Sequence, residues 1–194
     1  MKLFAIGAFA LATLAASTAV AQTAGPANPG PVIPGVCVYF NQRMLAQSTV
    51  GQAVQARMEQ LAQEVRGELT PYATAIQTEI GALQQGQATI PADQLNTRRQ
   101  QLQQRVQEAQ QLEQTRDAEL RYTLSEQRRL ISAAVEPILV TVYQERGCGL
   151  LLDRESVFIM NPAMDVTDLV IQRVNTALPT LSFNRLPVPA QAQQ

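Results

Sequence analysis

The stretch that decides the fold is Val50–Leu83, VGQAVQARMEQLAQEVRGELTPYATAIQTEIGAL. Its apolar residues recur in steps of four, four and three, a pattern repeated three times: Val50, Val54, Met58, Leu61, Val65, Leu69, Tyr72, Ile76, Ile80 and Leu83. An eleven-residue repeat of this kind, at roughly 3.67 residues per turn, predicts a long, nearly straight helix with one narrow apolar stripe. The helix would span about 50 Å. Because so narrow a stripe cannot form a globular core, it requires a second helix.

That second helix follows a break at Gly86. The segment Gln84–Pro91 is expected to be the tip of a helical hairpin, with Thr89 as the N-cap of the returning helix. Gly147 is placed to end the returning helix. Its apolar stripe is thin at first and thickens towards its end: Leu95, Leu102, Val106, Ala109, Leu112, Leu120, Leu124, Ile131, Val135, Ile138 and Val142. Four residues predict bends or flexible points in the two helices: Gly67, Pro71, Gly81 and Pro137.

Short β-prone segments flank the hairpin. Val36–Phe40 precedes it, and Leu150–Leu152 and Val157–Met160 follow it. A short helix is then expected to begin at Asp165–Thr167. The predicted fold class is α+β, predominantly α, with a coiled-coil-like helical arm that protrudes from a small β body with a short C-terminal helix. Because a small sheet has open edges, joining several subunits would protect it, which favours a symmetric oligomer.

The expected organisation has five parts. The first is a secretory signal peptide with a basic Lys2, a short apolar run and a small-residue cleavage site at Ala19–Ala21. Proline-rich and glutamine-rich composition predicts disorder on either side of the folded part. The boundaries are residues 1–21 for the signal peptide, 22–34 for a disordered leader, 35–49 and 138–178 for the β-rich body, 50–137 for the arm, and 179–194 for a disordered tail.

Cys37 and Cys148 are the two cysteines of the chain. An even number of cysteines in an exported protein favours a disulfide. The two lie at opposite ends of the predicted hairpin, which brings its own ends together. The alternative is a pair of buried, reduced thiols that pack as small apolar side chains.

The composition argues against several classes of function. The chain has no histidine, which removes the commonest general base and the commonest metal ligand. A net charge of −1 without a basic block gives no reason to expect a nucleic-acid partner. Phosphate-binding and nucleophile motifs do not occur in the sequence. The prediction is a protein that is not an enzyme and needs no cofactor or metal.

Two motifs flank the hairpin and are more specific than its composition. The first is Val36–Leu45, VCVYFNQRML, followed by Ser48 and Gly51. The second combines Gly149–Asp153 and Val157–Phe158 with the helix start DVTDLVIQRVN at Asp165–Asn175. In this order, behind a signal peptide, they resemble the Skp/OmpH family of periplasmic chaperones. The resemblance implies a homotrimer with a β-barrel body and three arms around a cavity. It also implies an ATP-independent holdase that binds unfolded outer-membrane proteins.

On this interpretation the apolar face of the arm contacts clients, through Leu69, Tyr72, Ile76, Ile80, Leu83, Leu95, Leu102 and Val106. The body residues expected at the trimer interface are Val36, Val38, Phe40, Leu150, Leu152, Val157 and Phe158. The alternative is a coiled-coil spacer or adaptor of the cell envelope, in which the stripe is only the seam between two helices. Basic arms and a membrane or lipopolysaccharide contact are not expected, because residues 66–110 carry four basic and four acidic side chains.

Overall fold

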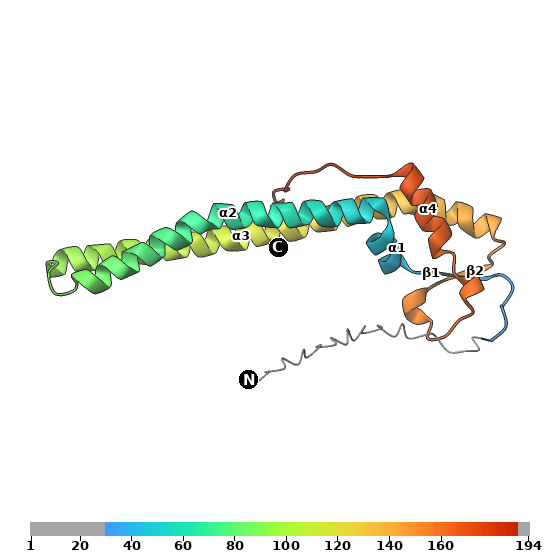
Figure 1. Ribbon diagram of the computed structural model, residues 1–194, viewed down its shortest axis with the longest axis horizontal. Coiled ribbons are helices and arrows are strands. Elements are labelled where there is room, and N and C mark those ends of the chain that lie inside the picture. The colour runs from blue at the N-terminus through green and yellow to red at the C-terminus, as the bar shows by residue number, and fades with distance from the viewer. Residues whose placement is uncertain (1–29, 190–194) are drawn as a thin grey trace, which may run out of the picture.

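Two long helices dominate the protein, whose computed structural model describes residues 30–189. Helix α2, Thr49–Gly86, and helix α3, Ala92–Glu145, run side by side as a hairpin that extends away from the rest of the chain (Figure 1). The expected helical arm is therefore present. The predicted signal peptide and most of the predicted leader lie outside the described residues.

Neither internal proline ends its helix. Pro71 lies inside α2 and Pro137 inside α3, and both helices continue past them. Helix α3 ends where glycine was expected to end it. Gly147 has a φ of +64°, the N–H of Gly147 donates to the carbonyl of Gln144, and the N–H of Cys148 donates to the carbonyl of Tyr143. This pair of bonds satisfies carbonyls that the last turn of a helix leaves free.

The tip of the hairpin differs from the prediction in one detail. The N-cap position of α3 is Pro91, and the side chain of Thr89 does not cap the helix. The Thr89 hydroxyl instead donates to the carbonyl of Gly86, 3.3 Å away. The backbone N–H groups of Thr89 and Ile90 donate to the same carbonyl. Thr89 is thus part of the turn that closes on the end of α2, two residues before the N-cap position of α3.

The body contains a two-stranded parallel sheet. Strand β1, Val36–Tyr39, pairs with strand β2, Leu150–Asp153, in the register Val36 to Leu150. Parallel strands need a long crossover connection, and the whole arm supplies it. On its other edge β1 accepts a backbone hydrogen bond from Val166 at the carbonyl of Val38.

The predicted third strand, Val157–Met160, is wrong. That segment has no strand pairing and lies between the short 3-10 helices η1, Arg154–Ser156, and η2, Pro162–Met164. The sequence identified its apolar, β-prone character correctly, but Arg154–Ser156 forms a 3-10 helix in place of a tight hairpin turn, and the segment does not pair along the free edge of β2. The side chain of Phe158 is 95% exposed as a result.

The core lies where the base of the hairpin meets two short helices, α1, Asn41–Gln47, and α4, Thr167–Ala177 (Figure 1). Strand β1, all four helices and the residues just before β2 and α4 bury side chains there: Cys37, Tyr39, Met44, Val50, Val54, Ile131, Val135, Val142, Cys148, Val166, Val170, Ile171 and Val174. Asp165 supports the start of α4, because its carboxylate accepts from the N–H of Thr167 at 2.8 Å.

The tail was expected to be disordered from residue 179, and its described part is not. Residues 179–189, called the tail segment below, return along the arm from the end of α4 (Figure 1). Leu181 and Phe183 pack against the core, and Arg185 is ion-paired with both long helices. The prolines of the segment prevent regular secondary structure, but they do not prevent docking.

Candidate functional site

The arm is well packed near the body and loosely packed towards its tip. Helix α2 buries Val50, Val54, Leu61 and Val65 in its first half, and α3 buries five residues from Thr123 onwards. Among the described residues 66–122, which we call the distal arm, Leu83 is the one buried side chain. The apolar stripe therefore continues to the tip, but two helices alone do not cover it.

The residues predicted to bind clients belong to this loosely packed part. Tyr72 is 42% exposed, and Leu83 is turned into the contact between the helices. The remaining ones are half-buried: Leu69, Ile76, Ile80, Leu95, Leu102 and Val106. Leu102 and Val106 line a shallow hollow on α3 together with the polar residues Arg99, Gln103 and Gln107. The structure thus places these side chains along one incompletely covered strip, with Leu83 the least available of them.

Arginine–glutamate pairs connect the two helices where apolar packing is weak. Near the tip, Arg98 of α3 makes a bidentate contact with Glu79 of α2, at 2.8 and 2.9 Å. That contact, above all the hydrogen bond, lowers the pKa of the Glu79 carboxyl. The bidentate geometry helps to fix the register of the two helices. It adds little to the stability of the fold, because the ion pair is open to water.

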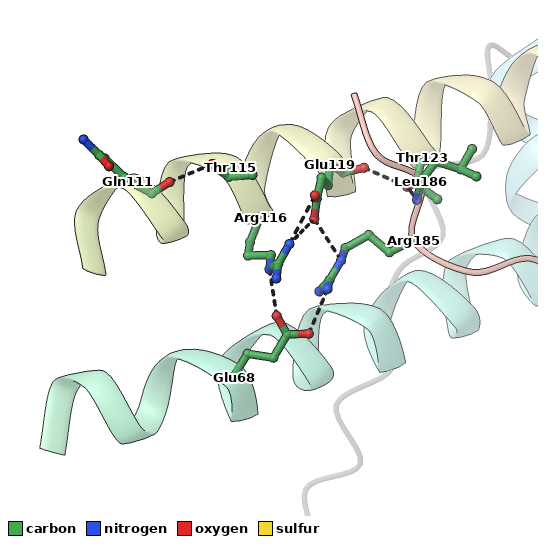
Figure 2. A network of polar contacts seen from close by, with 8 residues as sticks. All are labelled: Glu68, Gln111, Thr115, Arg116, Glu119, Thr123, Arg185 and Leu186. Atoms are coloured by element: carbon green, nitrogen blue, oxygen red, sulfur yellow. Dashed lines mark hydrogen bonds and ion pairs between the residues drawn. The ribbon is translucent and has the colours of Figure 1, made fainter. Parts of the chain in front are cut away.

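A second polar network joins three segments of the chain (Figure 2). Arg116 of α3 donates to Glu68 of α2 at 2.7 Å and to Glu119 at 2.9 Å. Arg185 of the tail segment donates to Glu68 at 2.8 Å and is paired with Glu119 at 3.0 Å. Two carboxylates therefore hold two guanidinium groups in a closed ring. The hydrogen bond from Arg185 is the largest cause of a lowered pKa at Glu68, and Arg116 adds to it.

The tail segment is the part of this surface that sequence reasoning missed. Its signal was present in the alternation of apolar and polar residues from Leu181 to Asn184. The proline-rich composition of the same segment predicts disorder instead. The partners of Arg185 lie 117 and 66 positions away in the sequence, so no local pattern indicates them.

The residues expected at a trimer interface divide into two groups. Val38 is 1% exposed within one chain, and Val36, Phe40, Leu152 and Val157 are half-buried. Leu150 and Phe158 are exposed, at 50% and 95%. Further exposed apolar side chains belong to the body and the foot of α3: Val32, Ile33, Val140 and Ile159. In the described residues, β2 has a second edge that pairs with no strand.

The disulfide joins the body to the end of the arm. Cys37 of β1 and Cys148, just before β2, are bonded, with their Cα atoms 5.7 Å apart. Both cysteines are buried in the core. The bond closes a loop of 111 residues that contains the whole hairpin. It therefore fixes the base of the arm and leaves the tip unconstrained.

Comparison with known proteins places this architecture in a family. Residues 35–174 match the family described as outer membrane protein (OmpH-like). The chain belongs to the OmpH-like family. A solved OmpH-like structure, a candidate outer membrane chaperone from Caulobacter crescentus CB15, is 36% identical, covers 84% of this chain and 95% of its own, and has a TM-score of 0.75. Among curated proteins, none matches the chain.

The motif that carried the family resemblance has a structural role in this OmpH-like chain. Thr167 accepts a hydrogen bond from the N–H of Phe40 at 2.9 Å, and Asp168 pairs with Arg43 at 2.9 Å. Asn175 accepts from the N–H of Thr49 at 2.8 Å, at the start of α2. The polar positions of the Asp165–Asn175 motif thus hold the corner between α1 and α2.

Residues 30–189 contain neither a membrane-spanning helix nor a cluster of metal ligands. No helix there is long and apolar enough to cross a membrane. Within the same range, no group of three or more cysteine, aspartate or glutamate side chains is arranged to hold a metal ion. The OmpH-like match ends at residue 174, so the docked tail segment lies beyond it.

Proposed function

We propose that the protein is an ATP-independent periplasmic holdase that binds unfolded outer-membrane proteins along the distal arm. Membership of the OmpH-like family supports a chaperone role, since its solved relative is a candidate outer membrane chaperone. The observation that carries the proposal is the apolar stripe that continues past Val65 while burial stops. A spacer would gain stability from a fully buried seam, whereas a holdase needs apolar surface that a client can cover.

The proposed contact uses many weak interactions. Tyr72, Ile76 and Ile80 offer partly exposed apolar surface, worth about 25 cal/mol per Å² of area that a client removes from water. Such contacts are non-directional, so they suit a partner without fixed structure. An unfolded chain can exchange among them without a preferred register, and no ATP is required to release it.

The active form is proposed to be a homotrimer assembled through the body. Exposed apolar side chains around the sheet, above all Phe158 and Leu150, support this proposal. The unpaired edge of β2 supports it as well, because another subunit can cover such an edge.

Sedimentation equilibrium of the mature protein should give about three times the mass of one chain. Phe158→Asp combined with Ile159→Asp should give a smaller species, and a stable wild-type monomer at micromolar concentration would contradict the trimer.

A light-scattering assay tests the holdase. A denatured outer-membrane barrel protein is diluted into buffer with and without the protein, and suppression of aggregation is expected at a slight molar excess of trimer. The Tyr72→Ser, Ile76→Ser double variant should suppress less. Gln77→Ser, at an exposed polar position on the same helix, is the matched control and should match the wild type. Unchanged aggregation with excess wild-type protein would favour the spacer.

A further inference from the structure

We propose that the groove occupied by the tail segment is a binding site for an extended polypeptide, and that the tail segment is its resident occupant. A client strand would displace it. The identity of the displacing client rests on the proposed holdase function. The existence of the site rests on the contacts of the tail segment alone.

The tail segment presents one face to the arm, as an extended chain does. Leu181 and Phe183 are partly buried against the core, while Ser182 and Asn184, which follow them in turn, are exposed. Further along, Val188 is half-buried between two exposed prolines, Pro187 and Pro189. Burial alternates with a period of two from Leu181 to Arg185 and again from Leu186 to Pro189, with a change of phase between the half-buried Arg185 and Leu186. Such alternation is the pattern of an extended chain with one covered side. The groove therefore accepts a chain without helical structure.

Part of the recognition does not depend on the sequence of the bound segment. The guanidinium of Arg57 on α2 donates to the backbone carbonyl of Phe183 at 3.2 Å. The hydroxyl of Thr123 on α3 accepts from the backbone N–H of Leu186 at 2.8 Å (Figure 2). Every residue carries a backbone carbonyl, and every residue except proline also carries a backbone N–H. Arg57 and Thr123 could hold another extended segment in the same way.

Two side chains of the tail segment make specific polar contacts with the arm. The side-chain oxygen of Asn184 accepts from Arg57 at 3.1 Å, and the other side chain is basic. Arg185 lies between Glu68 and Glu119, which also share Arg116 (Figure 2). Removal of Arg185 would leave two carboxylates facing one guanidinium. An incoming segment that supplies an arginine or lysine at this position would restore the balance. The groove is therefore selective for alternating apolar and polar residues with one basic side chain.

This chemistry matches the proposed clients. Strands of outer-membrane barrels alternate apolar and polar residues along their length. The groove also adjoins the loosely packed surface, because Glu68 precedes Leu69 and Arg116 follows the distal stripe residues of α3. A client strand that replaces the tail segment would lie in line with the distal arm. The tail segment would then limit how readily an empty arm binds a stray chain.

The test uses the full mature chain and two fluorescent peptides. One peptide has the sequence of residues 179–194, and the other is a barrel strand with alternating apolar residues and one arginine. The release variant is Phe183→Ala with Arg185→Ala, and Ser182→Ala in the same segment is the control. Because an intramolecular occupant lowers the apparent affinity for a competitor, the release variant should bind both peptides at least about tenfold more tightly than wild type and control. When Glu68→Gln is added to the release variant, its affinity for both peptides should fall, because one carboxylate partner of the basic side chain is lost.

Circular dichroism melts establish that each variant is folded. If the double variant melts at a clearly lower temperature than wild type, Arg185→Ala alone replaces it, because that variant keeps the apolar packing of Phe183. Arg185→Ala should also bind both peptides more tightly than wild type, by a smaller factor than the double variant. The aggregation assay reports separately on the holdase, so a protein that fails there can still bind the 179–194 peptide. Failure of the release variant to bind that peptide would overturn the site. Barrel-strand affinity equal in wild type and release variant would overturn the displacement and leave the tail segment a structural strap.

Discussion

At the scale of single residues, Gly51 controls the corner between α1 and α2. A Cβ atom added there would lie 1.7 Å from the carbonyl oxygen of Leu45, which is backbone and cannot rotate away. Gly51→Ala should therefore destabilise the protein by at least about 1–3 kcal/mol, the usual cost of overpacking. Chemical denaturation measures this.

Gly67→Ala is the matched control, because nothing lies within 4 Å of a Cβ at that helical position. It should stabilise the protein by about 0.5–1 kcal/mol, since alanine is the better helix former. Equal stability of the two variants would contradict the steric argument for the corner.

Another single residue, Glu68, makes the docking of the tail segment depend on pH. Its pKa is lowered from the ordinary value of 4.5 by Arg185 and Arg116, so the ionised form is favoured in the folded state. The stabilisation is present above pH 4.5 and is lost as the pH falls through the lowered pKa. The ring resonance of Phe183 should therefore shift towards its free position as the pH falls through this lowered pKa. Glu68→Gln should remove most of this pH dependence, and an unchanged titration in that variant would contradict the assignment.

At the scale of elements, α2 combines a stable first half with a second half that has few anchors. Amide exchange should be slow in β1 and in α2 up to Val65, and fast around Gly86. Gly67→Ala with Gly81→Ala should slow exchange in the distal arm, because both sites are open and helical, and leave the strands unchanged. Uniformly slow exchange along the wild-type arm would indicate a rigid rod.

The elements also differ in how well the sequence predicts them. The stripe from Val50 to Leu83 predicts α2 because helix periodicity is a local property. The strand prediction for Val157–Met160 is wrong because a strand needs a partner, which no local pattern shows, and a 3-10 helix at Arg154–Ser156 replaces the turn that would have paired the segment with β2. The tail segment was missed for the same reason, since Glu68 and Thr123 lie far away in sequence. The loose packing of the candidate site follows from the thin apolar stripe of α3. The side chains that stay exposed there can be identified only from the structure.

At the scale of the whole molecule, the disulfide between Cys37 and Cys148 ties the strand to the end of the hairpin. Closing a loop of 111 residues should stabilise the folded state by about 3–5 kcal/mol in the chain-entropy account. Reduction should therefore lower the melting temperature while client binding changes little, because the distal arm is free of the bond. The Cys37→Ser, Cys148→Ser variant should melt like the reduced protein. Two free thiols per chain in the denatured, unreduced protein would exclude the bond.

The charge of the whole arm decides how client binding responds to salt. Residues 66–110 carry four basic and four acidic side chains, and Arg98 and Glu79 among them neutralise each other across the helices. No large field should therefore attract a charged client, and binding should rest on apolar contact. Between about 50 and 500 mM salt the affinity should change far less than the roughly 10–10³-fold range of electrostatically steered association rates.

A variant with lysines at the exposed positions Gln77, Gln101 and Gln104 is the comparison. It should bind acidic clients more tightly at low salt and lose that gain as the Debye length falls from about 14 Å to below about 5 Å over this range of salt. A wild-type affinity that falls as steeply as that of the lysine variant would mean that charge, and not the half-buried stripe, holds the client.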